Sequence, residues 1–344
     1  HTALEWYGRR ELWRLPGRLL AFIPSIIRTR ALLRRFRPDL VHLNSSPLAP
    51  CGIACKLESV PVVWHIREPL ARGYMGLRRW LYREIIDRCA QRIVAISHYD
   101  ASLLKPSDAI RVIYNFVDFT TFDRSLDGSA VRVELGIPAD APAIAMLGGI
   151  AEPKGALVLV EALGRLIRRV PDVRVIIAGP PPAALGQPGI KGAIKRLLRV
   201  DAYQEAVQTA MAHLPEQARA ALIFTGIRRD MPRVIAAANC VVFPSVVPHF
   251  ARPLVEAAAM GKPGIGSRLG GPEELIVDGQ TGLLVPPGDP DALSQALADV
   301  LAKPEQAAQM GETAYRRALI LFEAALNAQA TIALYDEVLT GSSD

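Results

Sequence analysis

Short β-rich apolar runs alternate with helix-length stretches along most of this chain, and that alternation is what most constrains its fold. Runs of consecutive apolar residues are typical of parallel strands that are buried on both faces. Parallel strands also need long connections, because a tight turn cannot join them. We therefore predict an α/β fold with doubly wound sheets. The expected strands are residues 40–43, 61–66, 92–96, 109–114, 143–147, 173–178, 221–224, 240–243, 263–266 and 282–285.

The strands fall into two series, which predicts two domains in a chain of 344 residues. Residues 123–140 are rich in Asp, Ser, Gly and Pro, with one helical turn expected around 131–135, and they separate the series. We place one domain at 1–123, a second at 124–310, and a C-terminal helix at 311–344 that packs back toward the first domain. Pro304 is expected to divide the helical segments 291–302 and 305–339.

The first domain is expected to be incomplete at its start. Its series has four strands, against six in the second, and a helix over residues 5–37 precedes it. Strand 40–43 would then be an exposed apolar edge, and such edges promote aggregation.

Charge and cysteine usage exclude several classes of protein. A net charge of +6 is too small for a protein that binds nucleic acid over an extended basic surface. The longest apolar run, residues 19–27, is far shorter than a membrane-spanning helix. The four cysteines are Cys51, Cys55, Cys89 and Cys240, and they lack the paired spacing of a zinc site or of a set of disulfides. We therefore predict buried thiols in a reducing, cytoplasmic setting.

The N-terminal helix is strongly basic, with nine arginines and three acids up to residue 39. A solvated helix face is the plainer interpretation. The alternative is peripheral contact with an anionic membrane at its inner face.

The segment 248–289 carries the strongest sign of chemistry. Pro253 is placed to begin a helix that Gly261 ends, so the amides around 250–254 would be free donors at a positive helix end. Such an end can hold a phosphate. Glu256 lies one turn further on, where its carboxylate can accept from the sugar hydroxyls of a nucleotide. Its neighbours are apolar, and a carboxylate in such surroundings needs a partner, which favours a function over a surface position.

A glycine-rich turn follows strand 143–147. Gly148 and Gly149 allow close approach of a ligand to the backbone, and Lys154 can supply a positive charge to a diphosphate. Gly270 and Gly271 follow another strand and should join the same rim, since ligands bind at the carboxyl ends of parallel strands.

These residues resemble the donor-binding half of the retaining family-4 glycosyltransferases, which have the two-domain GT-B fold. The matching motifs are Glu256, GKP, GG-x-x-EL and DG-x-TGLLV-PP-GD, with weaker matches at Lys154-Gly155, 224–226 and 242–245. In the first domain, PDLVHLNSS (38–46), VVWHIREP (62–69), IVAIS (93–97) and YNFVD (114–118) resemble the acceptor-side strands of that family. The resemblance implies two Rossmann-like domains facing a central cleft, a nucleotide-sugar substrate and no cofactor.

The resemblance also implies roles for individual residues. The catalytic set is His65 beside the transferred sugar, Lys154 at the diphosphate and Glu256 at the ribose, while main chain at 226–228 would hold the base. The donor-binding set is Gly148, Gly149, Lys154, Gly226, Ile227, Arg228, His249, Phe250, Ala251, Arg252, Pro253, Leu254, Glu256, Gly270 and Gly271. The acceptor-side candidates are His42, Asn44, Ser45 and Arg67.

The sequence departs from the family pattern at two polar positions. Pro248 stands where the first glutamate of the Glu-x7-Glu motif is expected, and Gly149 stands where an arginine often precedes the lysine. His249, the residue after Pro248, is a candidate to replace part of the role of that glutamate. His65 also has a plainer interpretation, as a hydrogen-bonded core side chain.

No metal site is expected. The DxD spelling at 289–291 is interpreted as a helix N-cap and first turn, with Asp289 as the cap and Asp291 following Pro290.

The predicted function is retaining, metal-independent transfer of a hexose from a nucleotide-diphosphate sugar to a hydroxyl of a glycan, a lipid-linked or a small-molecule acceptor, as in polysaccharide biosynthesis. A nucleotide-sugar epimerase and a catalytically silent nucleotide-sugar-binding subunit are the alternatives.

Overall fold

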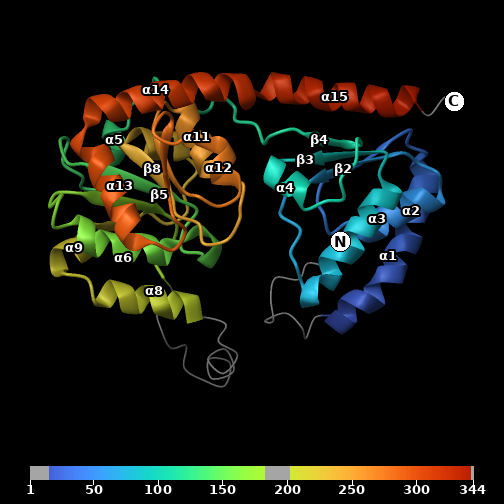
Figure 1. The fold of residues 1–344 in the computed structure, drawn as a ribbon, viewed down its shortest axis with the longest axis horizontal. Helices are drawn as coiled ribbons and strands as arrows, with labels where there is room; N and C mark the ends of the chain where they lie inside the picture. Colours follow the sequence, from blue (N-terminus) through green and yellow to red (C-terminus); the bar gives the residue numbers. More distant parts are fainter. Residues whose placement is uncertain (1–14, 183–201, 342–344) are drawn as a thin grey trace. The chain divides into compact units, whose positions relative to one another are not determined.

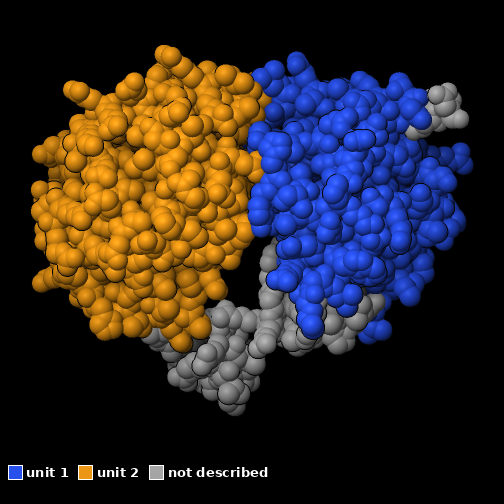
Figure 2. Space-filling view, in the orientation of Figure 1, with its two compact units in different colours: residues 1–115, 325–344 blue, residues 116–324 orange. Residues whose placement is uncertain are grey.

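The computed structural model describes residues 15–182 and 202–341, which form two compact units (Figure 2). Unit 1 comprises the residues up to Asn115 together with those from Ala325 onward, and unit 2 comprises Phe116–Ala324.

Unit 1 contains a parallel sheet in the order β1-β2-β3-β4 (Figure 1). Its strands are β1 (Val41–Leu43), β2 (Val62–Ile66), β3 (Arg92–Ala95) and β4 (Ile110–Val112). Its helices are α1 (Leu15–Phe36), α2 (Ala49–Leu57), the short 3-10 turn η2 (Tyr74–Gly76), α3 (Leu77–Cys89), α4 (His98–Ser102) and α15 (Ala324–Thr340). Among the described strands β1 is an edge, as expected.

Both faces of this sheet are covered, as the apolar runs predict. Along β2, Trp64 packs into a core with residues of α1, α2 and α3. Val63 faces the other way and packs with Leu334 and Val338 of α15. The C-terminal helix therefore completes the core of unit 1.

Unit 2 contains a six-stranded parallel sheet in the order β10-β9-β8-β5-β6-β7. Its strands are β5 (Ala143–Leu147), β6 (Arg174–Ala178), β7 (Leu222–Phe224), β8 (Cys240–Phe243), β9 (Gly264–Ser267) and β10 (Gly282–Val285). Its helices are α5 (Ser129–Glu134), the 3-10 turn η3 (Glu152–Lys154), α6 (Ala156–Leu166), α8 (Ala202–Ala212), α9 (Glu216–Ala220), α10 (Met231–Ala236), α11 (Arg252–Ala259), α12 (Gly271–Leu275), α13 (Pro290–Ala302) and α14 (Pro304–Leu321).

Strand β5 lies in the middle of this sheet and contributes to two cores. Ile144 and Met146 point to the face covered by α6, α8 and α13. Ala143 and Ala145 point to the face covered by α5, α10 and α11. This period of two is what a central strand of a doubly wound sheet requires.

All ten predicted strands are confirmed, with ends shifted by two residues at most. The four cysteines are free, and three of them are buried. The helical turn around 131–135 is confirmed as α5. The described part of the N-terminal helix is α1, while residues 5–14 and most of the Pro/Gly-rich connection 179–195 lie outside the described residues.

The structure divides at 115/116, eight residues before the boundary expected at 123/124. The reason is that residues 116–124 pack on α14: the Val117 amide donates to the Phe322 carbonyl at 2.9 Å, and Arg124 pairs with Glu312 at 2.6 Å. Helix α14 accordingly belongs to unit 2, and only α15 joins unit 1.

The single helix expected over 305–339 is wrong, because it breaks at residues 322–323 into α14 and α15. Val117 forms an isolated bridge with Glu323 at the break, and the Phe322 side chain is buried there. Packing against Val117, which lies about 200 positions earlier in the sequence, therefore interrupts a segment whose sequence pattern is helical throughout.

Candidate active site

The site in unit 2 lies where the strand order of the sheet reverses. From β5 the chain moves outward through β6 and β7, and it then returns to β8 on the other side of β5. The connections that follow β5 and β8 lead to helices on opposite faces of the sheet, α6 and α11. Open α/β sheets bind ligands in the crevice outside the carboxyl ends of the strands at such a point. The turn after β5 carries Gly148, Gly149 and Lys154, and the turn after β8 leads to His249 and α11.

Glycine is required in the turn after β5 for two reasons. Gly148, Gly149 and Gly155 all have positive φ angles, of 92°, 70° and 74°. A Cβ at Gly155 would lie 1.7 Å from the carbonyl oxygen of Pro244, which follows β8. The turn after β5 is therefore packed backbone to backbone against the turn after β8.

Lys154 occupies this crevice as a half-buried cation. Its Nζ donates to the Gly148 carbonyl at 2.6 Å, and it forms no ion pair with any described carboxylate. Burial lowers the pKa of Lys154. A cation that is held by a neutral carbonyl and partly stripped of water is well suited to receive an anionic ligand.

His249 lies close enough to Lys154 for the two to interact. Burial lowers the pKa of His249, and the charge of Lys154 lowers it further. Since the unperturbed value is already below 7, the ring is neutral at pH 7. A neutral imidazole can hydrogen-bond to a sugar or phosphate oxygen without a charge of its own.

The turn before α12 closes against the same loop. A Cβ at Gly270 would lie 3.0 Å from the Cβ of Pro248, and a Cβ at Gly271 would lie 2.4 Å from the carbonyl oxygen of His249. Gly270 also has a positive φ of 66°. The glycine-rich rim expected from the sequence thus brings three strand ends together within unit 2.

The start of α11 differs from the expectation of several free amides at 250–254. The helix begins at Arg252, and Pro253 is its second residue. The Ala251 amide donates to Nδ1 of His249 at 3.3 Å, and the Leu254 amide donates to the Ala251 carbonyl at 2.9 Å. Pro253 has no amide hydrogen, and the Ala251 and Leu254 amides are already bonded, so the row of free donors is shorter than predicted. Phe250 is buried just before the helix.

Ala251 at the helix start has a φ of 57°, in the left-handed region that favours glycine. It is fully buried. The backbone path into α11 is therefore held in a strained conformation by the surrounding packing.

Glu256 lies in the second turn of α11, and its carboxylate is largely buried, with 14% of the side chain exposed, as the apolar neighbours predict. Burial raises its pKa, and the charge of Arg252 opposes that rise. Arg252, which is largely exposed, donates to Oε1 at 3.1 Å. Glu256 and Lys154 form no ion pair with each other, and each has its own hydrogen-bond partner.

The segment after β7 has two distinct parts. Gly226 has a positive φ of 70°, and its amide donates to the Gly179 carbonyl at 3.1 Å, while the Ile227 side chain is 91% exposed. The Arg228 guanidinium is instead committed to Glu134 and Asp230, at 2.6 Å from each. These ion pairs raise its pKa. Any contact from Arg228 to a ligand would therefore come from its main chain.

In unit 1 the candidate histidines form one cluster. The rings of His42 and His65 lie 5.4 Å apart, edge to face. Burial, with smaller contributions from Arg67 and His42, lowers the pKa of His65 to about 4, and its Nε2 is buried with no hydrogen-bond partner among the described residues. Nδ1 of His42 lies 2.7 Å from the hydroxyl of Tyr335 on α15.

Of the other acceptor-side candidates, Arg67 and Asn44 contact each other, while Asn115 and Glu68 are partners outside the predicted set. Arg67 donates to Asn44 at 3.4 Å and to Asn115 at 2.7 Å. The Ser45 hydroxyl donates to Glu68 at 2.8 Å. Strand register could have indicated the His42 and His65 pairing, since His42 lies opposite Val63 and His65 points to the same face. No local signal indicates Tyr335, which is 293 residues away from His42.

The DxD sequence at 289–291 forms the N-cap and first turn of α13, as predicted. Asp289 accepts hydrogen bonds from the amides of Asp291 and Ala292, and Asp291 pairs with Arg165. Among the described residues no group of three or more His, Cys, Asp or Glu side chains is placed to hold a metal ion.

Two Rossmann-like parallel sheets, one of them with a glycine-rich turn and a lysine at its switch point, are typical of the GT-B glycosyltransferases. Comparison with known proteins gives the family: residues 129–317 match the model for glycosyl transferases group 1, and residues 5–121 match that for glycosyltransferase family 4. The chain belongs to this family and is a glycosyltransferase.

Individual relatives agree with this assignment. The D-inositol 3-phosphate glycosyltransferase of Saccharomonospora viridis is 30% identical over 329 residues, which covers 90% of this chain and 72% of the relative. A D-inositol 3-phosphate glycosyltransferase of Catenulispora acidiphila is 28% identical, covering 88% and 72%.

Solved structures share the fold. Anabaena HepE in complex with UDP and glucose has a TM-score of 0.75 at 22% identity, with 91% of this chain and 81% of that chain covered. Sucrose-phosphate synthase from Thermosynechococcus elongatus has a TM-score of 0.73 at 21% identity, covering 98% and 82%.

Proposed function

We propose that the chain transfers a hexose from a nucleotide-diphosphate sugar to a hydroxyl acceptor, with retention of configuration and without a metal ion. The observation that carries this proposal is the half-buried Lys154 ammonium at the switch point of unit 2. It lies in the glycine-rich turn after β5, which packs against the turn after β8. Two structures of one similar protein, Anabaena HepE, support the donor class, since one holds UDP and the other UDP-glucose.

In this proposal Lys154 binds the donor diphosphate and stabilises it as the leaving group. A fixed cation in a partly dry site stabilises developing negative charge more strongly than water does. Glu256 would accept hydrogen bonds from the ribose hydroxyls. Its carboxylate would then either lose the hydrogen bond from Arg252 or keep it beside the new ones. Main chain at Gly226, Ile227 and Arg228 would hold the base.

His249 is proposed to take over part of the role of the family glutamate whose position Pro248 occupies. The two residues are adjacent in the same loop, the pKa of His249 is lowered so that its ring is neutral, and Lys154 is near. His65 would lie beside the transferred sugar, with His42, Asn44, Ser45 and Arg67 on the acceptor side.

Metal independence follows from the same argument. Lys154 supplies the charge that a divalent ion would otherwise supply, and the two acids of the DxD spelling already cap α13 and pair with Arg165. Transfer activity should therefore be unchanged by EDTA, and a requirement for added Mn²⁺ or Mg²⁺ would contradict this part of the proposal.

The test is release of nucleoside diphosphate from a panel of nucleotide sugars, with and without acceptors. D-inositol 3-phosphate is the first acceptor to try, because the relatives are named for it. Acceptor-dependent release, with the anomeric configuration of the product retained, supports the proposal. Sugar conversion without an acceptor would indicate the epimerase alternative, and nucleotide binding without any turnover would indicate the silent subunit. The relatives favour transfer, since they are named as glycosyltransferases.

A cytoplasmic location and contact with an anionic membrane complete the proposal. On α1 the apolar side chains of Leu20, Ile23 and Ile27 are more than 60% exposed, and Arg28 lies beside them in the sequence. No helix in the described part of the chain is long and apolar enough to cross a membrane. Flotation with anionic vesicles tests the contact, and a protein that stays unbound at low salt would contradict it.

A further inference from the structure

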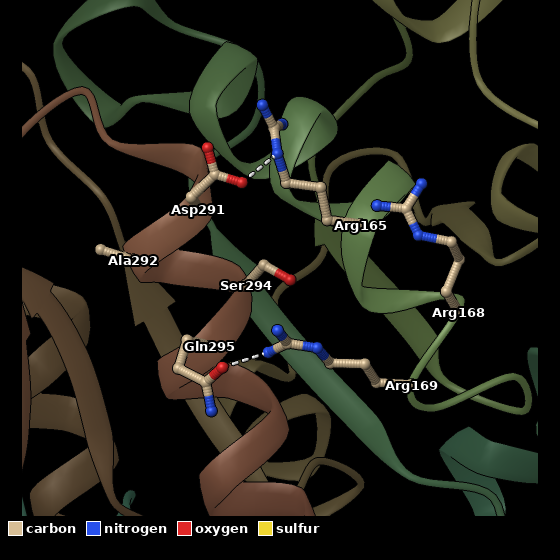
Figure 3. Close-up of a pocket in the computed structure, with 7 residues that line it drawn as sticks. All are labelled: Arg165, Arg168, Arg169, Asp291, Ala292, Ser294 and Gln295. Carbon is tan, nitrogen blue, oxygen red and sulfur yellow. Dashed lines mark hydrogen bonds and ion pairs between the residues drawn. The ribbon is translucent and has the colours of Figure 1, made fainter.

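A hollow lies in unit 2, between the carboxyl end of α6 and the first turns of α13 (Figure 3). Its volume is about 620 Å³. The lining residues are Arg165, Arg168, Arg169, Asp291, Ala292, Ser294 and Gln295. The lining holds three guanidinium groups and one carboxylate, so it has an excess of positive charge.

The three arginines are unequally engaged. Nε of Arg165 pairs with Asp291, and Nη1 donates to the Glu161 carbonyl at 2.9 Å. Arg169 donates to the Gln295 side chain. Arg168 is exposed and has no ion pair or side-chain hydrogen bond among the described residues. Most guanidinium donors at the hollow therefore remain available, and guanidinium groups match the geometry of phosphate oxygens.

Ser294 gives an independent sign that the hollow takes a ligand. Its side chain is only 2% exposed, and its hydroxyl is buried without a hydrogen-bond partner among the described residues. Figure 3 shows this hydroxyl directed from α13 toward the side of the hollow formed by Arg165 of α6 and by Arg168 and Arg169, which follow α6. A buried hydroxyl without a partner destabilises the fold, and a ligand oxygen in the hollow would satisfy it.

The hollow is separate from the donor crevice. Helix α6 begins directly after the turn that holds Lys154, whereas Arg165 lies near the other end of the helix. The 11 residues of α6 span about 16 Å at 1.5 Å per residue. A diphosphate that Lys154 holds cannot also contact the arginine hollow.

We propose that this hollow is a second anion site, which binds a phosphate group carried by a small soluble molecule. The charge and the hydrogen-bond donors select an oxyanion. The lining includes no exposed large apolar side chain, which a membrane-docking surface would need. The volume accommodates a phosphate together with part of the molecule that carries it.

The test is calorimetric titration of the full chain with pyrophosphate. It is carried out in the Lys154→Gln variant, so that the donor crevice does not contribute. We expect binding at one site, weakened about tenfold or more when Arg168→Gln and Arg169→Gln are added. Arg233→Gln is the matched control, because it removes one exposed charge on α10, on the opposite face of the sheet. That control should leave the affinity unchanged.

Ser294→Ala separates a built site from general attraction to positive charge. It should weaken pyrophosphate binding about threefold or more, since it removes a donor without changing the net charge. Absence of pyrophosphate binding at millimolar concentration would overturn the proposal. An equal decrease in affinity in the Arg233→Gln control would overturn it too.

Vesicles that carry phosphatidic acid present the same phosphate group on a membrane. Binding to these vesicles through Arg168 and Arg169, with no binding of soluble pyrophosphate, would overturn the assignment to a soluble ligand. None of these outcomes depends on sugar transfer, so the second site and the proposed activity succeed or fail separately.

Discussion

The close backbone contact at Gly155 allows a sharp test of how the crevice is built. Gly155 and Gly279 both have a φ of 74°, but their surroundings differ. A Cβ at Gly155 would lie 1.7 Å from the Pro244 carbonyl oxygen, whereas a Cβ at Gly279 would meet nothing within 4 Å. Substitution by alanine at Gly279 therefore costs only the left-handed backbone strain, while substitution at Gly155 costs the strain and the clash.

The magnitudes follow from these two terms. Left-handed strain for a residue with a Cβ is about 1–2 kcal/mol. Forcing a methyl group into packed surroundings adds about 1–3 kcal/mol or more, because neither the Pro244 carbonyl nor the turn after β5 can move freely. We expect Gly279→Ala to lower the free energy of unfolding by about 1–2 kcal/mol and Gly155→Ala to lower it by about 2–5 kcal/mol.

Urea unfolding, followed by circular dichroism, measures both variants against the parent protein. Because Lys154 precedes Gly155, Gly155→Ala should also weaken nucleotide binding, and Gly279→Ala should not. Equal decreases of stability in the two variants would refute the reasoning, since the close approach to Pro244 would then carry no cost.

Three further predictions concern other parts of the chain. Burial raises the pKa of Glu256 in the folded state. The free energy of unfolding of the parent, relative to that of Glu256→Gln, should therefore fall as pH rises from about 4.3 through that raised pKa. The affinity of the variant for nucleotide should be about tenfold lower than that of the parent. Urea unfolding of both proteins between about pH 4 and 8 checks the direction of this change. A parent whose stability increases relative to that of the variant as pH rises would contradict the prediction. Gly52→Ala should lower the free energy of unfolding by about 1–3 kcal/mol and change the fluorescence of Trp64, since a Cβ at Gly52 would lie 2.3 Å from that indole ring. Unchanged stability and emission would contradict the close packing. Tyr335→Phe should lower the stability of unit 1 by about 1 kcal/mol through removal of the hydrogen bond to His42, whereas an unchanged urea midpoint would show that this bond contributes nothing.

The strands could be predicted because burial on both faces leaves a local mark. An apolar run such as Ala143–Leu147 needs no distant information to be placed in a central strand. The glycine-rich turn with Lys154 and the buried Glu256 could be predicted for a similar reason, since each combines a local pattern with a demand for a partner.

What could not be predicted depends on contacts between distant segments. The break between α14 and α15 is set by Val117, and the boundary at 115/116 follows from the same packing. The Arg228 ion pair with Glu134 joins residues 94 positions apart, and the sequence shows nothing that links them. The amides at the start of α11 were expected to be free, but a strained Ala251 and the His249 ring take two of them.

The central claim is that the Lys154 ammonium binds the diphosphate of a nucleotide. Calorimetric titration with a panel of nucleoside diphosphates, on the parent protein and on Lys154→Gln, tests it most directly. Lys303→Gln is the control, since that lysine is exposed at the end of α13. We predict that one nucleoside diphosphate binds the parent and the control equally, and binds Lys154→Gln about tenfold or more weakly. Equal affinity for all three proteins would contradict the account.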